Sequence, residues 1–227
     1  MRHFQVLHNV MQSASEYQPE LDFNAFRRLA QARLLVHPAD ADAAGSGPSD
    51  YDLNPEMTAA NHGSLIPAAV LVPVIMQTPM RVLLTERTAH LNAHAGQIAF
   101  PGGKIDAGDL DARAAALREA REEIGLDPSL VETLGYVEPY RTGTGYIITP
   151  VVAFVSAAFT PEPDPAEVAE AFSVPLAFLM NGDNHKIDRR EWRGETRQFY
   201  AMPFEQRYIW GATAGIIRAL YRRLTTP

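Results

Sequence analysis

Three glutamates, Glu119, Glu122 and Glu123, fall within five positions of the stretch LREAREEIGL, which runs from Leu117 to Leu126. Residues three and four apart share one face of an α-helix, so Glu119 and Glu123 would stack with Glu122 beside them. Like charges repel at this spacing, and the last turn of a helix prefers cations. A bound divalent cation would remove both penalties, because ions such as Mg²⁺ take oxygen ligands. The alternative is a solvated acidic face that Arg118 partly neutralises.

A glycine turn precedes this acidic stretch. The sequence FPGGK, from Phe100 to Lys104, contains Gly102 and Gly103, where backbone can approach a ligand closely. A Gly-Gly turn alone is weak evidence, since it also serves as an ordinary turn at the end of a strand. A loop that joins such a turn to an acidic helix end is a stronger indication of a phosphate or metal site.

Composition narrows the class of protein. The chain has 227 residues, with 46% hydrophobic residues, 21% charged residues and a net charge of −7. This acidic balance argues against a nucleic-acid partner. The absence of cysteine excludes disulfides, zinc-thiolate sites and cysteine nucleophiles. The longest apolar run, Leu65 to Met76, contains two prolines and is too short to span a membrane, so we expect a cytoplasmic protein without a membrane partner.

The elements that would position the acidic stretch follow from residue patterns. Asp22 is placed to cap a helix with the apolar line Phe23, Phe26, Ala30 and Leu34. Residues 38–61 are rich in Ala, Asp, Gly, Pro and Ser and predict a linker. We therefore expect an N-terminal helical extension and linker over 1–61 and the main domain over 62–227.

Strands and helices alternate irregularly in the main domain. Strands are predicted at 65–76, 81–85, 131–138, 146–155 and 197–202, the first two as a hairpin, with a short strand running from Gly96 into the glycine turn. Helices are predicted at 110–124, capped by Asp109 and ended by Gly125, at 208–223, and in the short segments AEVAEAF and PLAFLM. Without regular βαβ repetition, the pattern indicates an α+β fold with a mixed sheet.

The segment from Gly103 to Leu126 resembles the Nudix box, G-x5-E-x7-R-E-U-x-E-E-x-G-U, where U is apolar. Arg118 to Leu126 matches at every specified position, whereas Asp109 replaces the first glutamate and one extra residue precedes Arg118. The resemblance implies a Nudix-type α/β/α sandwich and hydrolysis of a diphosphate bond with Mg²⁺ or Mn²⁺.

A second segment, Leu83 to Gly103, resembles the signature of the coenzyme A pyrophosphatase branch, roughly L-L-T-x-R-[SA]-x3-R-x3-G-x3-F-P-G-G. Arg87, Gly96 and the FPGG turn match, while Thr88 and Asn92 depart from it. The resemblance implies cleavage of coenzyme A or its derivatives to 3′-phospho-AMP and 4′-phosphopantetheine. The substrate would be a small nucleotide of the coenzyme A type, and the sequence leaves a homodimer open.

Residue roles follow from the resemblance. Glu119 and Glu123 would be the principal metal ligands, with Glu122 as ligand or base and the Gly102 carbonyl as a further ligand. Arg118 would orient Glu122. The later base candidate is Glu167, whose alternative is a first-turn helix glutamate. Further site residues are those that would meet the substrate, namely Arg87, Gly102, Gly103 and Lys104. The alternatives are that Arg87 pairs with a carboxylate and that Lys104 is solvated.

Two alternatives remain at this level. One is a Nudix hydrolase for another nucleoside diphosphate derivative such as ADP-ribose, which the Asn92 departure leaves open. The other is a non-catalytic nucleotide-binding Nudix module, although such modules typically lose box carboxylates.

Overall fold

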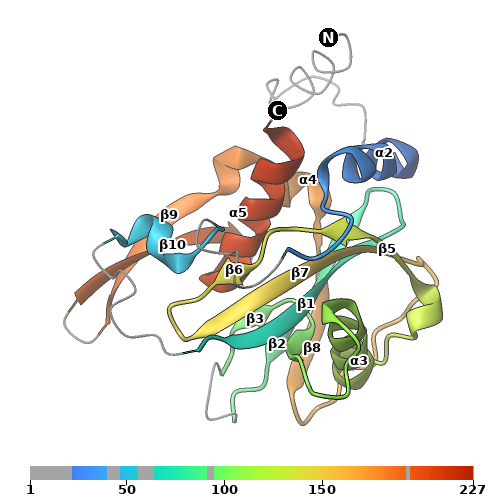
Figure 1. Ribbon diagram of the computed structural model, residues 1–227, viewed down its shortest axis with the longest axis horizontal. Coiled ribbons are helices and arrows are strands. Elements are labelled where there is room, and N and C mark those ends of the chain that lie inside the picture. The colour runs from blue at the N-terminus through green and yellow to red at the C-terminus, as the bar shows by residue number, and fades with distance from the viewer. Residues whose placement is uncertain (1–21, 40–46, 56–63, 91–94, 193–194, 227) are drawn as a thin grey trace.

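Two long strands, β1 (Ile66–Ile75) and β7 (Tyr146–Val155), pair in parallel along their whole length at the centre of the main sheet (Figure 1). The structure is a computed structural model, and it describes residues 22–39, 47–55, 64–90, 95–192 and 195–226. Both strands are rich in β-branched residues and are buried on both faces, which is the usual character of a central parallel pair.

Antiparallel strands extend the sheet on both sides of this pair. On one side lie β5 (Val131–Tyr136) and β6 (Tyr140–Arg141), both paired with β7. On the other side lie β2 (Arg81–Arg87), paired with β1, and β8 (Val168–Pro175), paired with β2. The sheet is therefore mixed, which confirms the predicted α+β class.

The pair β1–β2 separates after a short contact. The two strands pair only where Val74 and Ile75 meet Val82 and Arg81, which confirms the predicted hairpin. Beyond this point the following segment fills the gap between them, because β3 (Ile98–Ala99) pairs with β2 and β4 (Gly102–Lys104) pairs with β1. The glycine turn thus lies inside the divided sheet.

Helices cover both faces of the sheet. Ala69 and Leu71 of β1 pack toward α3 (Ala112–Ile124), whereas Val72 and Val74 pack on the opposite face. That face is covered by α2 (Phe23–Arg33), α4 (Leu176–Leu179) and α5 (Ala212–Thr225). Figure 1 shows α3 and α5 on opposite sides of the β1–β7 pair. The layers form an α/β/α sandwich.

Helix α2 begins as expected. The Asp22 carboxylate accepts a hydrogen bond of 2.7 Å from the Ala25 N–H, and Phe26 and Ala30 are fully buried. The helix ends at Arg33, and Leu34 then packs into the same core. An N-terminal helix is thus part of the folded structure.

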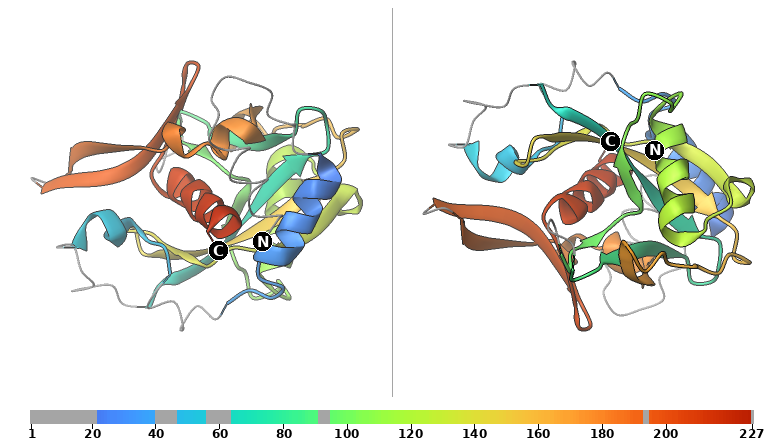
Figure 2. Two further views of the ribbon diagram at one scale, coloured as in Figure 1. Left: turned by 90° about the horizontal axis from the view of Figure 1, so that it is seen from above. Right: turned by 90° about the horizontal axis from the view of Figure 1, so that it is seen from below.

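A three-stranded antiparallel sheet stands beside the main one. It consists of β9 (Lys186–Trp192), β10 (Glu195–Phe204) and β11 (Arg207–Trp210). Figure 2 shows α5 between this sheet and the segment that holds the 3₁₀ turn η2 (Asp50–Leu53). Two further 3₁₀ turns are η4 (Pro128–Leu130) and η5 (Gly182–Asn184).

Residues 47–55, within the predicted linker, are bonded to the main domain. The partly buried Asp50 carboxylate accepts hydrogen bonds from the Tyr140 hydroxyl (2.8 Å) and the Gly143 N–H (2.7 Å). The Asn54 side chain bonds both backbone groups of Gln198 in β10, donating at 2.9 Å and accepting at 2.8 Å. This segment therefore connects the loop before β7 to the smaller sheet.

Three of the helix predictions are wrong. Helix α3 begins two residues later than predicted, with Asp111 rather than Asp109 as its N-cap, because Asp109 is bonded to Arg118. The segment AEVAEAF contributes most of its residues to strand β8, since pairing with β2 overrides its helical composition. The last helix begins at Ala212, because Gly211, with φ of 64°, separates it from β11.

No helix in the described ranges is long and apolar enough to cross a membrane.

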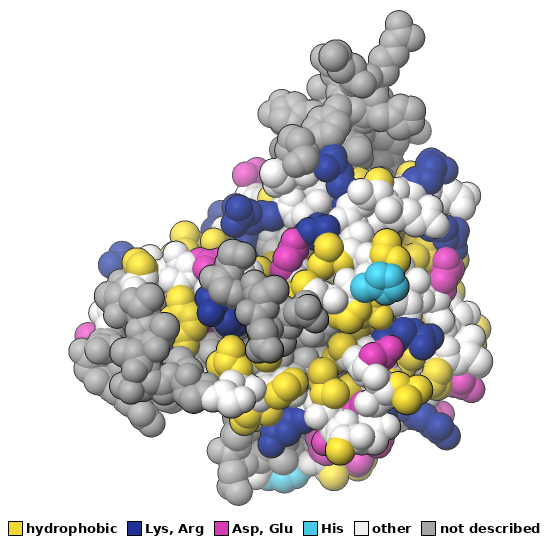
Figure 3. Space-filling view, viewed as in Figure 1, with side chains coloured by type: hydrophobic (Ala, Val, Ile, Leu, Met, Phe, Trp, Pro, Cys, Tyr) yellow, Lys and Arg dark blue, Asp and Glu magenta, His cyan; other side chains and the backbone are white. Residues whose placement is uncertain are grey.

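On the face shown in Figure 3, acidic and basic side chains are interspersed over the described surface.

Asn54→Ala should lower the free energy of unfolding by about 1–3 kcal/mol, because it leaves the backbone groups of Gln198 without their buried partner. Urea unfolding followed by circular dichroism measures this change. The control is Gln31→Ala on the exposed face of α2, expected within about 0.5 kcal/mol of the parent. An equally small effect of Asn54→Ala would show that the bonds between Asn54 and Gln198 do not stabilise the domain.

Candidate active site

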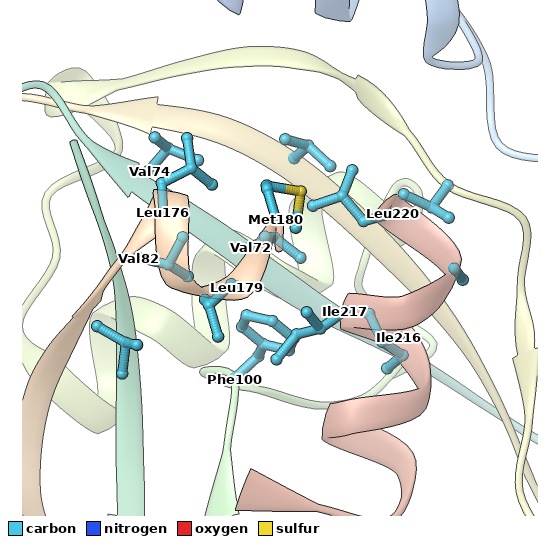
Figure 4. Packing of buried hydrophobic residues seen from close by; sticks show 14 of the residues in the cluster. Val72, Val74, Val82, Phe100, Leu176, Leu179, Met180, Ile216, Ile217 and Leu220 are labelled. Atoms are coloured by element: carbon cyan, nitrogen blue, oxygen red, sulfur yellow. The ribbon is translucent and has the colours of Figure 1, made fainter. Parts of the chain in front are cut away.

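The glycine turn is anchored by the residues that precede it. The Phe100 ring is buried and points toward Leu179 and Ile217 in the core (Figure 4). The Pro101 carbonyl accepts a 2.8 Å hydrogen bond from the Leu71 N–H. Gly102 has a φ of 156°, and a Cβ there would lie 2.4 Å from the Ala69 carbonyl oxygen. Only glycine fits at this close approach to β1.

Gly103 lies directly against the acidic helix. A Cβ at Gly103 would meet a Glu119 carboxylate oxygen at 2.5 Å. The missing side chain therefore leaves room for the carboxylate between helix α3 and strand β4. This close packing explains why the turn and the helix occur together.

Glu123 is the most buried carboxylate of the three, with an exposed fraction of 5%. Its Oε2 accepts a hydrogen bond of 3.3 Å from the Gly102 N–H, and its Oε1 lies 3.8 Å from Nη1 of Arg87. Burial raises the pKa of Glu123 to about 7, helped by the charges of Glu119 and Glu167. The bond from Gly102 and the charge of Arg87 oppose this shift only in part.

Glu119 shares this environment. Burial raises its pKa, and the charges of Glu122 and Glu167 act in the same direction, while the bond from Arg118 opposes it. Carboxylates on α3 and in the loop before β8 therefore interact through space, and the site accumulates negative charge.

Arg118 is held by three carboxylates and a carbonyl. Its guanidinium bonds Asp109 at 3.0 and 2.9 Å, Glu119 at 2.9 Å, Glu122 at 3.0 Å and the Lys104 carbonyl at 3.1 Å. The predicted i,i+4 pair with Glu122 is confirmed. The Arg118 bond also lowers the pKa of Asp109. Asp109 therefore anchors Arg118. This pair was not predicted from the sequence, although Asp109 stands where the Nudix box has its first glutamate.

The loop before β8 closes the C-terminal end of α3. The Ile124 carbonyl accepts from the Glu162 N–H and the Glu123 carbonyl accepts from the Asp164 N–H, both at 2.9 Å. These bonds satisfy carbonyls that the helix leaves unpaired. The same loop carries Glu167, whose Oε2 lies 3.9 Å from Nη2 of Arg87. Glu167 thus precedes a strand instead of starting a helix.

The predicted site residues divide into two groups. Those that meet around Glu123 are Glu119, Glu167, Arg87, Gly102 and Gly103. Glu122 lies on the outer side of α3, with 60% of its side chain exposed, and the Lys104 residue is exposed while its carbonyl bonds Arg118. Asn92 lies outside the described residues.

The donor chemistry fits a hard divalent cation. Glu123 is buried, and its negative charge is only weakly compensated. The Glu119 carboxylate lies in the space that a Cβ at Gly103 would fill. Both side chains offer the oxygen ligands that such a cation takes. As the described side chains stand, no three Asp, Glu or His residues converge closely enough to hold a metal ion. Binding would therefore require carboxylates such as Glu119, now bonded to Arg118, to turn toward Glu123.

A family model described as the NUDIX domain matches residues 65–195, which is more than half of the chain. The chain belongs to the Nudix family. Among its relatives are proteins named uncharacterized Nudix hydrolase NudL. The one from Escherichia coli strain K12 / DH10B is 44% identical over 154 residues, covering 67% of this chain and 80% of the relative. That from Shigella boydii serotype 18 is 43% identical with the same coverage.

Solved Nudix structures are also similar. The Nudix hydrolase RenU from M. smegmatis is 26% identical with a TM-score of 0.42, covering 49% of this chain and 71% of its own. The NUDIX domain of Shewanella oneidensis NrtR, complexed with ADP ribose, is 20% identical with a TM-score of 0.46, covering 76% and 99%. Nudix hydrolases act on diphosphate bonds of small nucleotide-derived substrates and generally use Mg²⁺ or Mn²⁺.

The raised pKa of Glu123 predicts a pH-dependent stability of the metal-free protein. A carboxyl that holds its proton more tightly when folded stabilises fully below its ordinary pKa of 4.5, and this contribution is lost as pH rises through about 7. Glu123→Gln should therefore gain stability relative to the parent, on the order of 1–3 kcal/mol, between pH 5 and pH 8.

Urea unfolding with a chelator at the two pH values measures this difference. The control is Glu122→Gln, one position away on the exposed side of the helix. A Glu123→Gln effect of equal size at both pH values would contradict the burial of a carboxylate whose charge is compensated only in part.

Proposed function

We propose that this Nudix hydrolase is a Mg²⁺- or Mn²⁺-dependent pyrophosphohydrolase that cleaves the diphosphate of coenzyme A or its derivatives. The products are 3′-phospho-AMP and 4′-phosphopantetheine, and the protein acts in the cytoplasm. The support is that the two sequence motifs meet at one carboxylate. Arg87 and Gly102, from the segment that resembles the coenzyme A branch, both contact Glu123 of the Nudix box.

The reaction adds water across a P–O–P linkage. The water oxygen forms a new bond to one phosphorus, and the bond from that phosphorus to the bridging oxygen breaks. A divalent cation neutralises phosphate charge and makes bound water more acidic. Glu119 and Glu123, with the Gly102 carbonyl, would hold the cation between β4 and α3. Arg118, fixed by Asp109, orients the Glu119 carboxylate through a 2.9 Å hydrogen bond, and Glu119 would have to leave this bond to serve as a ligand.

Two basic groups face the negative charge of the substrate. Arg87 points to the acidic site from the end of β2, and Lys104 is exposed where β4 ends. Arg87 is the better placed for a phosphate oxygen because it already lies beside the carboxylates that would bind the cation.

The proton of the attacking water goes to a glutamate. We assign this role to Glu167, with Glu122 as the alternative. The charge of Glu167 is felt by both Glu119 and Glu123, whereas Glu122 is bonded to Arg118 on the outer side of the helix. Glu167 is also about half exposed, which leaves its carboxylate accessible to water.

Incubation of the protein with coenzyme A and Mg²⁺ or Mn²⁺, followed by chromatography, should give both products in equal amounts. Glu123→Gln should lower kcat/KM by about 10²-fold or more, since the charge that holds the cation is lost. The control is Glu132→Gln, whose ion pair with Arg27 in the outer part of the fold does not involve the site. If the protein hydrolyses ADP-ribose but forms neither product from coenzyme A, the proposed substrate is wrong.

Glu167→Gln should lower kcat by about 10²–10⁴-fold, the range for losing a general base. The residual rate of the variant should keep rising with pH where the parent is level, since hydroxide then replaces the missing base. Glu122→Gln is the matched comparison. If Glu122→Gln shows that pH–rate profile and Glu167→Gln does not, the base lies in the Nudix box.

A further inference from the structure

The two arginines of the site are held very differently. Arg118 makes hydrogen bonds of 2.9–3.1 Å to Asp109, Glu119, Glu122 and the Lys104 carbonyl. The Arg87 guanidinium instead lies 3.8 Å from Glu123 and 3.9 Å from Glu167, beyond hydrogen-bonding distance. Arg118 is a fixed part of the framework, whereas Arg87 is a loose counter-cation between two carboxylates.

The backbone beneath Arg87 is fixed. Its N–H donates to the Gln97 carbonyl at 3.0 Å, and its carbonyl accepts from the Gly96 N–H at 3.1 Å. The register of the β2–β8 pair shifts between Glu86 and Arg87. Such bulges re-aim side chains and occur often beside active sites. Arg87 can therefore change position through its side chain, while its backbone stays in place.

Glu123 provides the reason for such a change. Its carboxylate is buried, and Arg87 is the cation that compensates its charge. A divalent ion bound to Glu123 would supply that compensation more strongly and would repel the neighbouring guanidinium. The displaced side chain would then meet the negative oxygens of a diphosphate, for which a guanidinium is a good partner.

We propose that Arg87 is an exchangeable counter-cation. It neutralises Glu123 until a divalent ion binds, and its side chain then moves to the diphosphate of the substrate. The inference rests on the metal-dependent function proposed above, but it does not depend on which nucleotide carries the diphosphate. It predicts effects of opposite sign on metal binding and on diphosphate binding.

The test is isothermal titration of the intact protein, first with Mn²⁺ and then, at saturating Mn²⁺, with inorganic pyrophosphate. Arg87→Met removes the charge and keeps a similar stem. It should bind Mn²⁺ about tenfold more tightly, because no guanidinium competes for Glu123, and pyrophosphate about tenfold more weakly. Arg87→Lys keeps a cation and should return the Mn²⁺ affinity toward that of the parent.

Arg81→Met is the matched control. Arg81 lies at the other end of β2, where its guanidinium bonds Ser173. Its substitution should leave both affinities within about twofold of the parent, since it does not contact the acidic site. Circular dichroism confirms that each variant is folded.

Unchanged or weaker Mn²⁺ binding by Arg87→Met would overturn the exchange, because it would make Arg87 a bystander or a residue that orients Glu123. Tighter Mn²⁺ binding with unchanged pyrophosphate affinity would also overturn it. Failure of the parent protein to bind Mn²⁺ would overturn the metal-dependent function as well. Binding of Mn²⁺ without coenzyme A turnover would reject only the substrate assignment.

Discussion

The close approach of the glycine turn to β1 requires a glycine at position 102, and the absence of a side chain at Gly103 leaves the Glu119 carboxylate of α3 in its observed position. A Cβ at either position would overlap with the backbone of β1 or with the Glu119 carboxylate. The turn is in turn held by Phe100 in the core and by the division of β1 from β2, which opens the sheet at this point. Burying acidic groups at such a close contact costs stability, and the raised pKa of Glu123 records that cost. The site is thus maintained by the packing of the whole sandwich.

Two arginines, Arg118 and Arg87, compensate the negative charge of these carboxylates from different sides. Arg118, fixed by Asp109, binds the outer side of the acidic group, so Glu119 and Glu122 remain ordered without converging. Arg87 approaches the inner side at a longer distance. Carboxylates outnumber arginines on both sides, but the outer ones are hydrogen-bonded to Arg118, whereas the inner ones lie 3.8 and 3.9 Å from Arg87. A divalent ion and a diphosphate would together complete the balance on the inner side, which is the physical basis of the proposed hydrolysis.

Much of this arrangement could be predicted from the sequence. The Asp22 cap, the hairpin, the Gly125 helix end and the acidic helix face are local patterns, and all are found in the structure. The strand conformation of AEVAEAF cannot be predicted from its composition, because it depends on pairing with β2, a non-local interaction. Asp109 was misplaced for a similar reason, since a capping role and an ion pair across a loop use the same residue type. The buried bonds of Asp50 and Asn54 join segments far apart in the chain and have no local signature.

The proposed hydrolysis requires a divalent ion on the inner side of α3, beside the glycine turn. Crystals of the protein soaked in Mn²⁺ test this directly through anomalous scattering. The predicted result is an anomalous peak at coordination distance, about 2.0–2.3 Å, from carboxylate oxygens of Glu123 and Glu119, with the Arg87 guanidinium moved away from Glu123. Two results would contradict the proposed site. One is a peak only on the outer side of α3, at Glu122, and the other is no peak near Glu123 with Arg118 still bonded to Glu119.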